Sequence, residues 1–361
     1  MNIIYVEDCC EILDSKRVPI TASERKRGEY PYYGANGIQD YVSDYIFDDE
    51  LVLLAEDGGN FGSKERPIAY KVSGKCWVNN HAHVLKPRAC INVDYLCYAL
   101  MFYNVDGMVN GATRQKLTQA AMRKMQIPFR RMEEQVHIVD ELNRLVKIKE
   151  QRQQELILLD TLIKARFVEM FGNPEANEKE WKMNTFGDIC TVRQGLQIPI
   201  SKRLTQYEDD CYEYITVQYL HGGKEREYIK SPKTSVICTQ NDILMTRTGN
   251  TGMVVTGVDG VFHNNFFLID FDRNKYDKDF LVQYLKLDII QADILRRAGT
   301  STIPDLNHSD FYKIKIFEPP IELQKQFTEL ITQVDKSKSA VKKALDETQL
   351  LFDSLMQEYF G

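Results

Sequence analysis

The feature that most constrains this chain is a long stretch, from Met132 to Gly172, with no proline and no glycine before its last residue. Its apolar residues recur at spacings of three and four, at Ile138, Leu142, Leu145, Leu156, Leu159, Ile163 and Met170. This spacing is typical of an α-helix that buries one apolar stripe against a partner helix. About 40 residues that rise about 1.5 Å each would form a rod on the order of 60 Å long.

A second stretch, residues 321–361, is a copy of the first in strict register. Every matched pair is 189 residues apart, and 189 is 27 × 7, so a seven-residue repeat keeps its phase (324 − 135 = 361 − 172 = 189). The matched pairs include Gln135 with Gln324, Leu142 with Ile331, Phe171 with Phe360 and, upstream of the helices, Leu117 with Leu306, Met122 with Phe311 and Ile127 with Ile316. The sequence therefore predicts a duplicated module, in which a globular part is followed by a long helix.

The predicted fold class is α+β, with two similar globular domains that alternate with two long helices. The predicted boundaries are 1–131 for the first domain, 132–172 for the central helix, 173–320 for the second domain and 321–361 for the last helix. We expect the helices to pair as an antiparallel coiled coil within one chain, although a heptad stripe is also typical of oligomers. Lys149, Arg152 and Arg166 fall at seam positions, where they would extend to solvent or meet acidic partners.

The globular parts repeat as well, but less strictly. VEDCCEILDSKRVPI at 6–20 matches FGDICTVRQGLQIPI at 186–200, GNFG at 59–62 matches GNTG at 249–252, and Asn79-Asn80 matches Asn264-Asn265. The offsets drift from 180 through 190 to 185, so the loops differ in length while the frame persists. Short apolar alternations between Gly, Asn and Asp clusters predict strands joined by tight turns. Helices in strict register joined to divergent globular parts indicate one shared role and two different recognition tasks.

Composition limits the class of protein. A hydrophobic fraction of 43% is ordinary for a folded chain. The sequence has no apolar run near 20 residues and no signal-peptide pattern, so we expect a cytoplasmic protein without membrane contact. Eight cysteines without paired spacing then predict reduced thiols. A net charge of −6 argues against a free-standing basic nucleic-acid binder, but not against a DNA-binding protein whose basic residues are clustered.

Several motifs together resemble the specificity subunit of type I restriction–modification systems. They are PYYGANGIQDYV at 31–42, WVNNHAHVL at 77–85, the GATRQKL and GTSTIPDLNHSDF loops, and the Pro-then-Glu/Gln openings of the two helices. The resemblance covers essentially the whole chain. It implies a non-catalytic subunit with two target-recognition domains, each of which binds one half of a split site in double-stranded DNA. It also implies antiparallel helices that set the spacer and dock methyltransferase subunits, two in number, with separate restriction subunits and no cofactor in this chain.

Specific DNA contact requires Arg or Lys for guanine edges, Asn or Gln for adenine, and polar loops for phosphates. The candidate residues on such loops are Arg25, Lys26, Arg27, Tyr32, Tyr33, Asn36, Lys64, Arg66, Arg114, Lys116, Lys202, Arg203, Arg247, Thr248 and Asn250. Arg247 is the strongest candidate, because it follows a short strand and opens a Gly-containing loop. The alternative for this loop is a hairpin turn with a solvated Arg. For the first region, the alternative is a solvated loop beside packed tyrosines.

Catalytic chemistry is not indicated. Glu318-Pro319-Pro320-Ile321 has a methyltransferase-like Pro-Pro pair, but it lacks the accompanying Asn/Asp and aromatic residue and lies where a helix N-terminus favours proline. Cys76, His81, His83 and Cys90 could be drawn as a zinc site, yet one of the two histidines is better explained by packing or hydrogen bonding. We therefore predict no catalytic residues and no metal. A coiled-coil scaffold whose paired globular domains bind proteins remains the alternative function.

Overall fold

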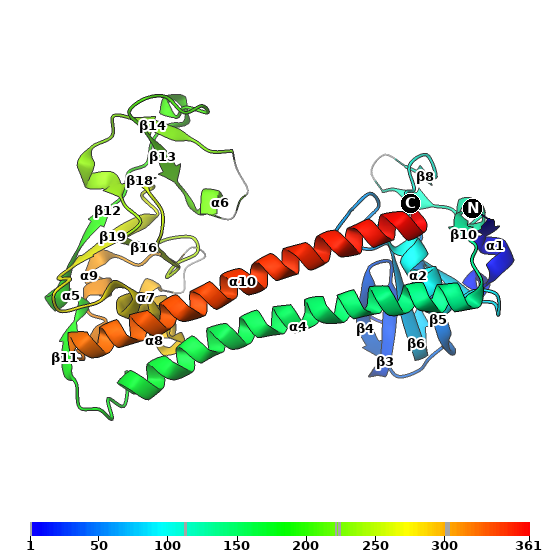
Figure 1. The fold of residues 1–361 in the computed structure, drawn as a ribbon, viewed down its shortest axis with the longest axis horizontal. Helices are drawn as coiled ribbons and strands as arrows, with labels where there is room; N and C mark the ends of the chain where they lie inside the picture. The colour runs from blue at the N-terminus through cyan, green and yellow to red at the C-terminus, as the bar shows by residue number, and fades with distance from the viewer. Residues whose placement is uncertain (1, 112–113, 221, 223–224, 300–303) are drawn as a thin grey trace. The chain divides into compact units, whose positions relative to one another are not determined.

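The computed structural model describes residues 2–111, 114–220, 222, 225–299 and 304–361 (Figure 1). The chain divides into two compact units, and each is described by itself. Unit 1 comprises residues 1–153 and 343–361, and unit 2 comprises residues 154–342. Each long helix begins in one unit and ends in the other, so both units contain a segment of each helix. The fold is α+β, with two mixed globular parts and two long helices, as the sequence predicts.

Unit 1 is built around a six-stranded sheet with strand order β2-β7-β5-β6-β3-β4. These strands are β2 (Cys10–Ile12), β7 (Ala82–Pro87), β5 (Phe47–Ala55), β6 (Ala69–Val78), β3 (Arg27–Gly34) and β4 (Gly37–Val42). Strands β3 and β6 run parallel, with Tyr32 opposite Trp77, and the other neighbours run antiparallel. The smaller elements are β1 (Ile3–Tyr5), α1 (Val6–Cys9), η1 (Asp14–Lys16), α2 (Val93–Met101), β8 (Val109–Asn110), β9 (Lys116–Leu117), α3 (Gln119–Arg123) and β10 (Gln126–Pro128).

Strand β5 shows why the sheet of unit 1 is buried on both faces. Val52 and Leu54 point into the core formed with α2 and the long helices, whereas Leu51 and Leu53 point into a second core on the other face. This alternation follows from the two-residue period of a β-strand. Helix α2 fits between the sheet and the long helices, because its buried positions run almost continuously from Tyr95 to Leu100.

Unit 2 repeats this plan with its strands divided between two four-stranded sheets, β12-β19-β16-β17 and β14-β13-β18-β15. The strands are β11 (Lys182–Thr185), β12 (Cys190–Gln194), β13 (Cys211–Ile215), β14 (Tyr228–Lys230), β15 (Ile237–Cys238), β16 (Ile243–Thr246), β17 (Val254–Val255), β18 (Gly260–Phe262), β19 (Phe266–Phe271) and β20 (Lys315–Glu318). The helices are α5 (Phe186–Ile189), η2 (Ile200–Lys202), α6 (Val217–Leu220), η3 (Thr234–Val236), α7 (Lys278–Lys286), α8 (Asp288–Ala298) and α9 (His308–Tyr312).

Strand pairing shows that the two globular parts share one topology. Cys10 of β2 lies opposite Pro87 of β7, and Cys190 of β12 lies opposite Phe271 of β19. The parallel pair β3–β6 has its counterpart in β13–β18, where Tyr214 lies opposite Val261. The duplication inferred from the sequence is therefore present in the backbone.

The structure changes one residue match between the units, because Asn79 of unit 1 corresponds to His263, whereas the sequence comparison matches it with Asn264. The amide of Asn79 donates to a β3 carbonyl and its side chain accepts from the amide of His81. In unit 2 both interactions are made by His263, whose Nδ1 accepts from the amide of Asn265. The structure thus places Asn79 on His263 and not on Asn264.

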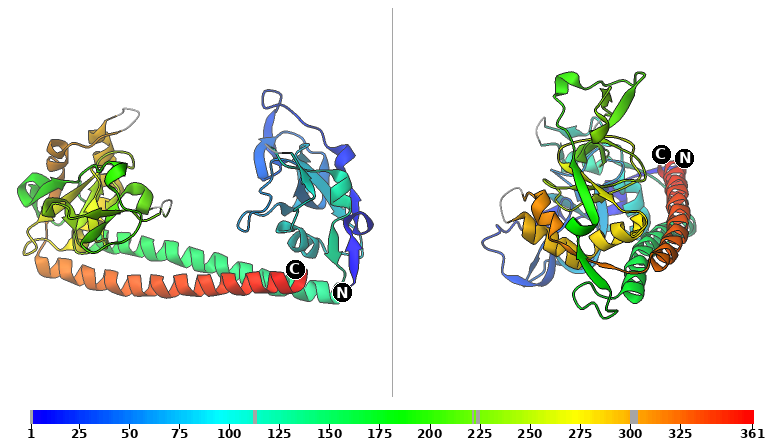
Figure 2. Two further views of the ribbon diagram at one scale, coloured as in Figure 1. Left: turned by 90° about the horizontal axis from the view of Figure 1, so that it is seen from above. Right: turned by 90° about the vertical axis from the view of Figure 1, so that its left-hand side faces the viewer.

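The long helices are α4 (Met132–Phe171) and α10 (Ile321–Phe360), and each runs 40 residues without a break. In unit 1, Tyr359 donates to Glu141 at 2.6 Å, and Lys149 donates to Gln349. Residue numbers along α4 increase while those of their contacts on α10 decrease, so the two helices are antiparallel within this unit (Figure 2).

The helix segments in unit 2 pair in the same sense. Asp160 of α4 meets Lys338 of α10, and Phe167 packs edge-on against Phe327 at 5.4 Å between ring centroids. Together with the contacts of unit 1, this confirms the antiparallel pairing that the sequence predicts. Among the charged seam residues, Lys149 has an amide and an aromatic ring as its partners. Its ammonium donates to the side chain of Gln349 and lies 5.2 Å from the centroid of the Phe352 ring.

A buried glutamine joins each long helix to its own globular part. The side chain of Gln135 accepts from the amide of Asn92 at 2.8 Å and donates to the carbonyls of Cys90 and Arg130. Asn92 is the N-cap of α2, so this glutamine also fixes where α2 begins.

The matched Gln324 repeats all three hydrogen bonds in unit 2. It accepts from the amide of Asp277, the N-cap of α7, at 2.8 Å and donates to the carbonyls of Lys275 and Pro319. Both modules therefore have a buried glutamine at this position of the long helix. In each module its side chain provides hydrogen-bond partners for backbone groups that water does not reach.

Among the described residues, no helix combines the length and the apolar character needed to cross a membrane.

Candidate nucleic-acid interface

In unit 1, three of the predicted DNA-contacting residues converge around the turn that follows β5. Asp57 pairs with Lys116 as an isolated β-bridge, and Arg114 donates to the Asp57 carboxylate at 2.6 Å. Asn36, at the tip of the β3–β4 hairpin, donates to the carbonyl of Gly58 at 3.0 Å. The structure therefore gathers Asn36, Arg114 and Lys116 on one surface, where all three are exposed. Part of the GATRQKL motif, residues 112–113, lies outside the described residues.

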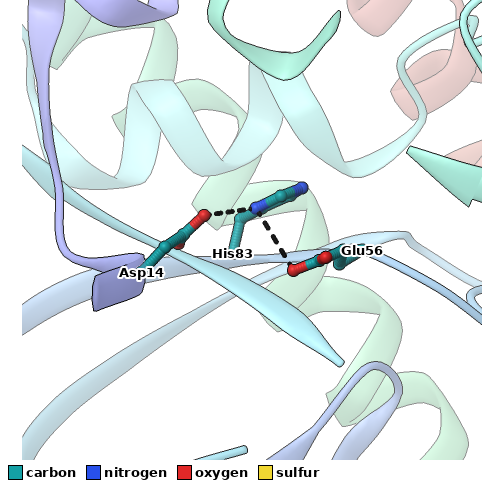
Figure 3. Close-up of side chains that lie close together, drawn as sticks. All are labelled: Asp14, Glu56 and His83. Atoms are coloured by element: carbon teal, nitrogen blue, oxygen red, sulfur yellow. Dashed lines mark hydrogen bonds and ion pairs between the residues drawn. The ribbon is translucent and has the colours of Figure 1, made fainter. Parts of the chain in front are cut away.

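Beneath this surface lies a buried ionic cluster of Asp14, Glu56 and His83, drawn in Figure 3. The His83 Nδ1 lies 2.7 Å from Asp14 Oδ2 and 3.7 Å from Glu56 Oε2. Its Nε2 lies 2.9 Å from the carbonyl oxygen of Leu117. Since a carboxylate and a carbonyl oxygen can only accept, each ring nitrogen carries a hydrogen, and His83 is an imidazolium between two carboxylates.

Further cations complete the charge balance of this cluster. Arg17 donates to Glu56 at 2.6 Å, and Lys116 lies 3.0 Å from the other oxygen of the same carboxylate. Asp14 also accepts from Gln119 at 2.9 Å and from the amide of Val84. A buried carboxylate persists only with such partners. The cluster thus ties η1, the end of β5, β7, β9 and α3 together below the exposed loop.

The cluster offers three side chains of metal-binding types, but the chemistry of the donor set does not suit a cation. Both ring nitrogens of His83 are engaged as donors, and Arg17 and Lys116 already neutralise Glu56. The zinc grouping considered from the sequence is not assembled. His83 lies in the ionic cluster, whereas Cys76 packs in the core on the opposite face of the sheet.

The electrostatics of the cluster lower the pKa values of both carboxyl groups. For Asp14, burial by itself raises the pKa, but the hydrogen bond and positive charge of His83, with Gln119 and the Val84 amide, outweigh burial. For Glu56, burial is likewise outweighed by Arg17, Lys116 and His83. Both groups are therefore charged at neutral pH.

Acid is expected to weaken unit 1 through these carboxylates. Because their folded pKa values lie below the unfolded values of about 3.9 and 4.3, their stabilisation is fully present above about pH 5 and is lost as the pH falls below about 4. Urea unfolding between pH 7 and 3 would measure this loss, and an Asp14→Asn variant should show a shallower pH dependence over the same range. An identical pH profile for variant and wild type would contradict the assignment.

Two other predicted residues, Arg25 and Arg203, form matching internal clasps. The guanidinium of Arg25 lies over the ring of Tyr32 at 4.3 Å, donates to the carbonyl of Ile20 and pairs with Asp40. Both the arginine and the tyrosine ring are largely withdrawn from solvent, with 18% of the Arg25 side chain and 1% of Tyr32 exposed. Tyr33 packs beside Tyr70. These positions stabilise the β3–β4 hairpin.

Arg203 makes the same contacts in unit 2. Its guanidinium lies over Tyr214 at 5.0 Å, donates to the carbonyl of Ile198 and pairs with Glu227 at 3.0 Å. Lys26 and Lys202 are the chain neighbours of the two clasp arginines, yet both are exposed. Three further predicted cations that are exposed outside the clasps are Arg27, Lys64 and Arg66.

In unit 2 the corresponding surface is the hairpin turn between β16 and β17. Arg247 opens this turn, and its guanidinium makes two hydrogen bonds to the carboxylate of Asp305, at 3.0 Å and 2.7 Å. Thr248 forms an isolated β-bridge with Asp305, and Asn250 is exposed at the tip. Gly249 has a φ of 84°, a left-handed conformation that favours glycine, which explains the Gly in this turn.

Sequence reasoning missed the acidic partners at both surfaces. Glu56, Asp57 and Asp305 each hold a predicted cation in place, yet each lies far along the chain from that cation. One sequence signal could have indicated Asp305. The alignment of the two modules pairs Lys116 with Asp305 at the constant offset of 189, so a base in one module is matched by an acid in the other (305 − 116 = 189).

Known proteins resemble this chain along most of its length. The type I restriction modification DNA specificity domain matches residues 1–158 and 178–348. A Haemophilus influenzae protein assigned as a type I restriction enzyme specificity subunit is 27% identical over 94% of this chain and 89% of its own length. The specificity subunit of the Methanocaldococcus jannaschii type I enzyme MjaVIII is 24% identical over 57% of this chain and 47% of its own length.

Two solved structures share the fold. The type I restriction–modification S subunit of M. genitalium superposes with a TM-score of 0.60 at 15% identity, covering 100% of this chain and 96% of its own. A chain from a study of assembly and conformational transition in a type I system gives a TM-score of 0.62 at 14% identity, covering 99% and 97%. With the family domain matched twice over most of the sequence, the chain belongs to the type I restriction–modification DNA specificity family, as a specificity subunit and not as an enzyme.

Proposed function

We propose that each globular part binds one half of a bipartite site in double-stranded DNA, and that the helix pair sets the spacer between the halves. The observation that carries this proposal is a duplicated backbone with unlike side chains on equivalent surface turns. The long helices keep one register, and a single buried glutamine anchors each of them in the same way. An unchanged frame with changed contact residues suits a protein that must recognise two different sequences at one fixed separation.

The chemistry of the exposed turns supports DNA as the ligand. Arg114, Lys116 and Asn36 offer donors and an amide on one surface of unit 1. In unit 2, Arg247 and Asn250 lie on one turn. Arg and Lys pair with guanine edges and phosphates, and Asn pairs with adenine, so these sets can distinguish base pairs in the major groove. The net charge of −6 makes binding depend on such local clusters and on a partner.

The helices also expose apolar side chains that suit partner subunits. On the α4 segment of unit 2, Ile157 and Leu158 are 58% and 57% exposed, and on the α10 segment of unit 1, Leu350 and Leu351 are 69% and 50% exposed. Leu162 and Leu351 are equivalent at the offset of 189, and both are exposed. This equivalent exposed pair favours two methyltransferase subunits that dock at related positions, whereas Ile157 and Leu158 align with Asp346 and Glu347 and lie outside the repeat. Restriction subunits would join that complex to cleave DNA.

Binding of defined duplexes tests this proposal. The chain, reconstituted with its methyltransferase subunits, should retain a duplex that carries its own modified sequence more strongly than a scrambled duplex of equal length at the same salt concentration. Equal retention of both duplexes would favour the alternative, a scaffold whose globular parts bind proteins.

Exchange of one globular part should change one half-site only. Replacing residues 182–318, from β11 to β20, with the region of another family member keeps both strands of the β11–β20 pair together. The contacts of the β5 turn in unit 1 lie outside the exchanged region, so the sequence bound by unit 1 should persist. Mapping of modified bases in host DNA measures the outcome. A change in both half-sites would show that the two parts do not act independently.

A further inference from the structure

The two units carry an ion pair at the same backbone position with its charges exchanged. In unit 1, the amide of Leu117 donates to the carbonyl of Glu56 at 2.7 Å, directly after β5. The Glu56 carboxylate holds the Lys116 ammonium at 3.0 Å. The acid therefore lies at the strand end, and the base lies on the returning segment β9.

In unit 2 the backbone makes the same contact with the opposite chemistry. The amide of Leu306 donates to the carbonyl of Arg247 at 2.8 Å, directly after β16. Here the base lies at the strand end and Asp305, on the returning segment, is the acid. Leu117 and Leu306 are 189 residues apart, as are Lys116 and Asp305 (306 − 117 = 305 − 116 = 189). Because the backbones correspond, the difference between the units at this point lies in the side chains.

Within the part of the chain that the structure describes, Asp305 engages one edge of the Arg247 guanidinium and no residue engages the other edge. Oδ1 accepts from Nε at 3.0 Å and Oδ2 accepts from Nη2 at 2.7 Å, so the carboxylate occupies the Nε–Nη2 edge. The Nη1–Nη2 edge still presents two parallel N–H donors. Guanine is the base whose major-groove edge offers two adjacent acceptors, O6 and N7, to such a pair of donors.

Neighbouring groups fix this arrangement. Thr251 donates to the carbonyl of Pro304 at 2.8 Å, which joins the turn to the segment that carries Asp305. His308 lies nearby, and burial together with the positive charge of Arg247 lowers its pKa. His308 is therefore neutral at pH 7, which leaves Arg247 as the local positive charge. A guanidinium held in one plane loses little conformational freedom when it binds.

We propose that Arg247 recognises a guanine in the half-site bound by unit 2, and that Asp305 is the residue that positions it. This inference rests on the proposed function. The corresponding ion pair of unit 1 cannot recognise a base in this way, because Glu56 stands in the place of Arg247 and its partner Lys116 is a point charge without a planar pair of donors. Lys116 instead contributes affinity for phosphate or for a single acceptor. The exchanged pair is then a determinant of the difference between the two half-sites.

Two substitutions in the reconstituted complex separate recognition from simple charge. Asp305→Asn keeps the shape of the side chain but weakens its hold on the guanidinium. Arg247→Lys keeps the positive charge but removes the paired donors. Relative binding is measured for duplexes with each base pair of the wild-type site changed in turn. Each variant should lose about 10-fold or more of the discrimination at one G·C pair in one half-site, within the range of about 1–3 kcal/mol for a bidentate contact.

The control is Glu208→Gln, which removes an exposed carboxylate that pairs with Lys230 elsewhere in unit 2. It should leave discrimination unchanged at every position. The proposal is overturned if Arg247→Lys and Asp305→Asn bind less tightly but discriminate as the wild type does, since this pattern indicates a phosphate contact. It is also overturned if the half-site of unit 2 contains no G·C pair. A wild-type complex without any sequence preference would instead refute the DNA-binding function itself, and this inference with it.

Discussion

Replacing Asp14 with alanine is expected to destabilise unit 1 by about 3–5 kcal/mol, the usual cost of removing one partner of a buried ion pair. The substitution leaves the His83 imidazolium without its closest acceptor at 2.7 Å. It also leaves the Gln119 amide and the Val84 amide without their acceptor. Chemical unfolding monitored by hydrogen exchange would measure the loss, and amides of unit 2 should keep their protection.

The duplication provides a matched control for this experiment. Strand β12 pairs with β19 as β2 pairs with β7, so Phe267 of β19 corresponds to His83 of β7. Gln194 lies opposite Phe267, and Asp14 is hydrogen-bonded to His83, so Gln194 occupies the place of Asp14 in unit 2. Gln194 is exposed, so Gln194→Ala should change stability by about 0.5 kcal/mol or less. If both substitutions had equally small effects, the cluster would not stabilise the fold.

Lengthening both long helices by four residues is expected to move the two half-sites apart by about two base pairs. Four residues add about 6 Å of helix, and one base pair rises about 3.4 Å. The insertions belong after Gln153 in α4 and after Lys342 in α10, where the two compact units divide. Mapping of modified bases in a host that carries the variant would give the new spacer.

A longer insertion and a one-sided insertion make this prediction strict. Seven residues in both helices add about 10 Å, so the spacer should grow by about three base pairs, with the heptad phase retained. Four residues in α4 alone would prevent the Lys149–Gln349 and Asp160–Lys338 pairs from forming together, since they lie on opposite sides of the insertion. Such a variant should lose DNA binding. An unchanged spacer in the two-sided variants would show that the helices do not set it.

The long helices and the duplication could be predicted from the sequence because both depend on local or periodic information. The spacing of Ile138, Leu142 and Ile163 marks the buried stripe, and all three are buried in the structure. The constant offset of 189 needed only a comparison of the chain with itself. Gln135 and Gln324 were aligned correctly, yet their hydrogen bonds to the N-cap residues of α2 and α7 could not be inferred from the helix pattern.

The buried ionic cluster could not be predicted, because its members come from segments that are far apart in the sequence. Asp14 and Gln119 are 105 residues apart, and no local pattern indicates that they meet. His83 was considered as a metal ligand, but its partners became apparent only when strands β5 and β7 were paired. The same limit applies to Arg25, which resembles a free basic residue in the sequence and forms an internal clasp in the fold.

The sharing of helices between units has a consequence for biosynthesis. The core of unit 1 includes Phe352 and contacts Phe360, whose ring lies 5.0 Å from Tyr95, whereas unit 2 needs only residues 154–342. A ribosome completes the chain of unit 2 before it adds residues 343–361. Unit 1, whose residues 1–153 are translated first, therefore keeps an uncovered apolar surface on α2 until residues 343–361 are added. By then the whole of unit 2 has been translated and can fold.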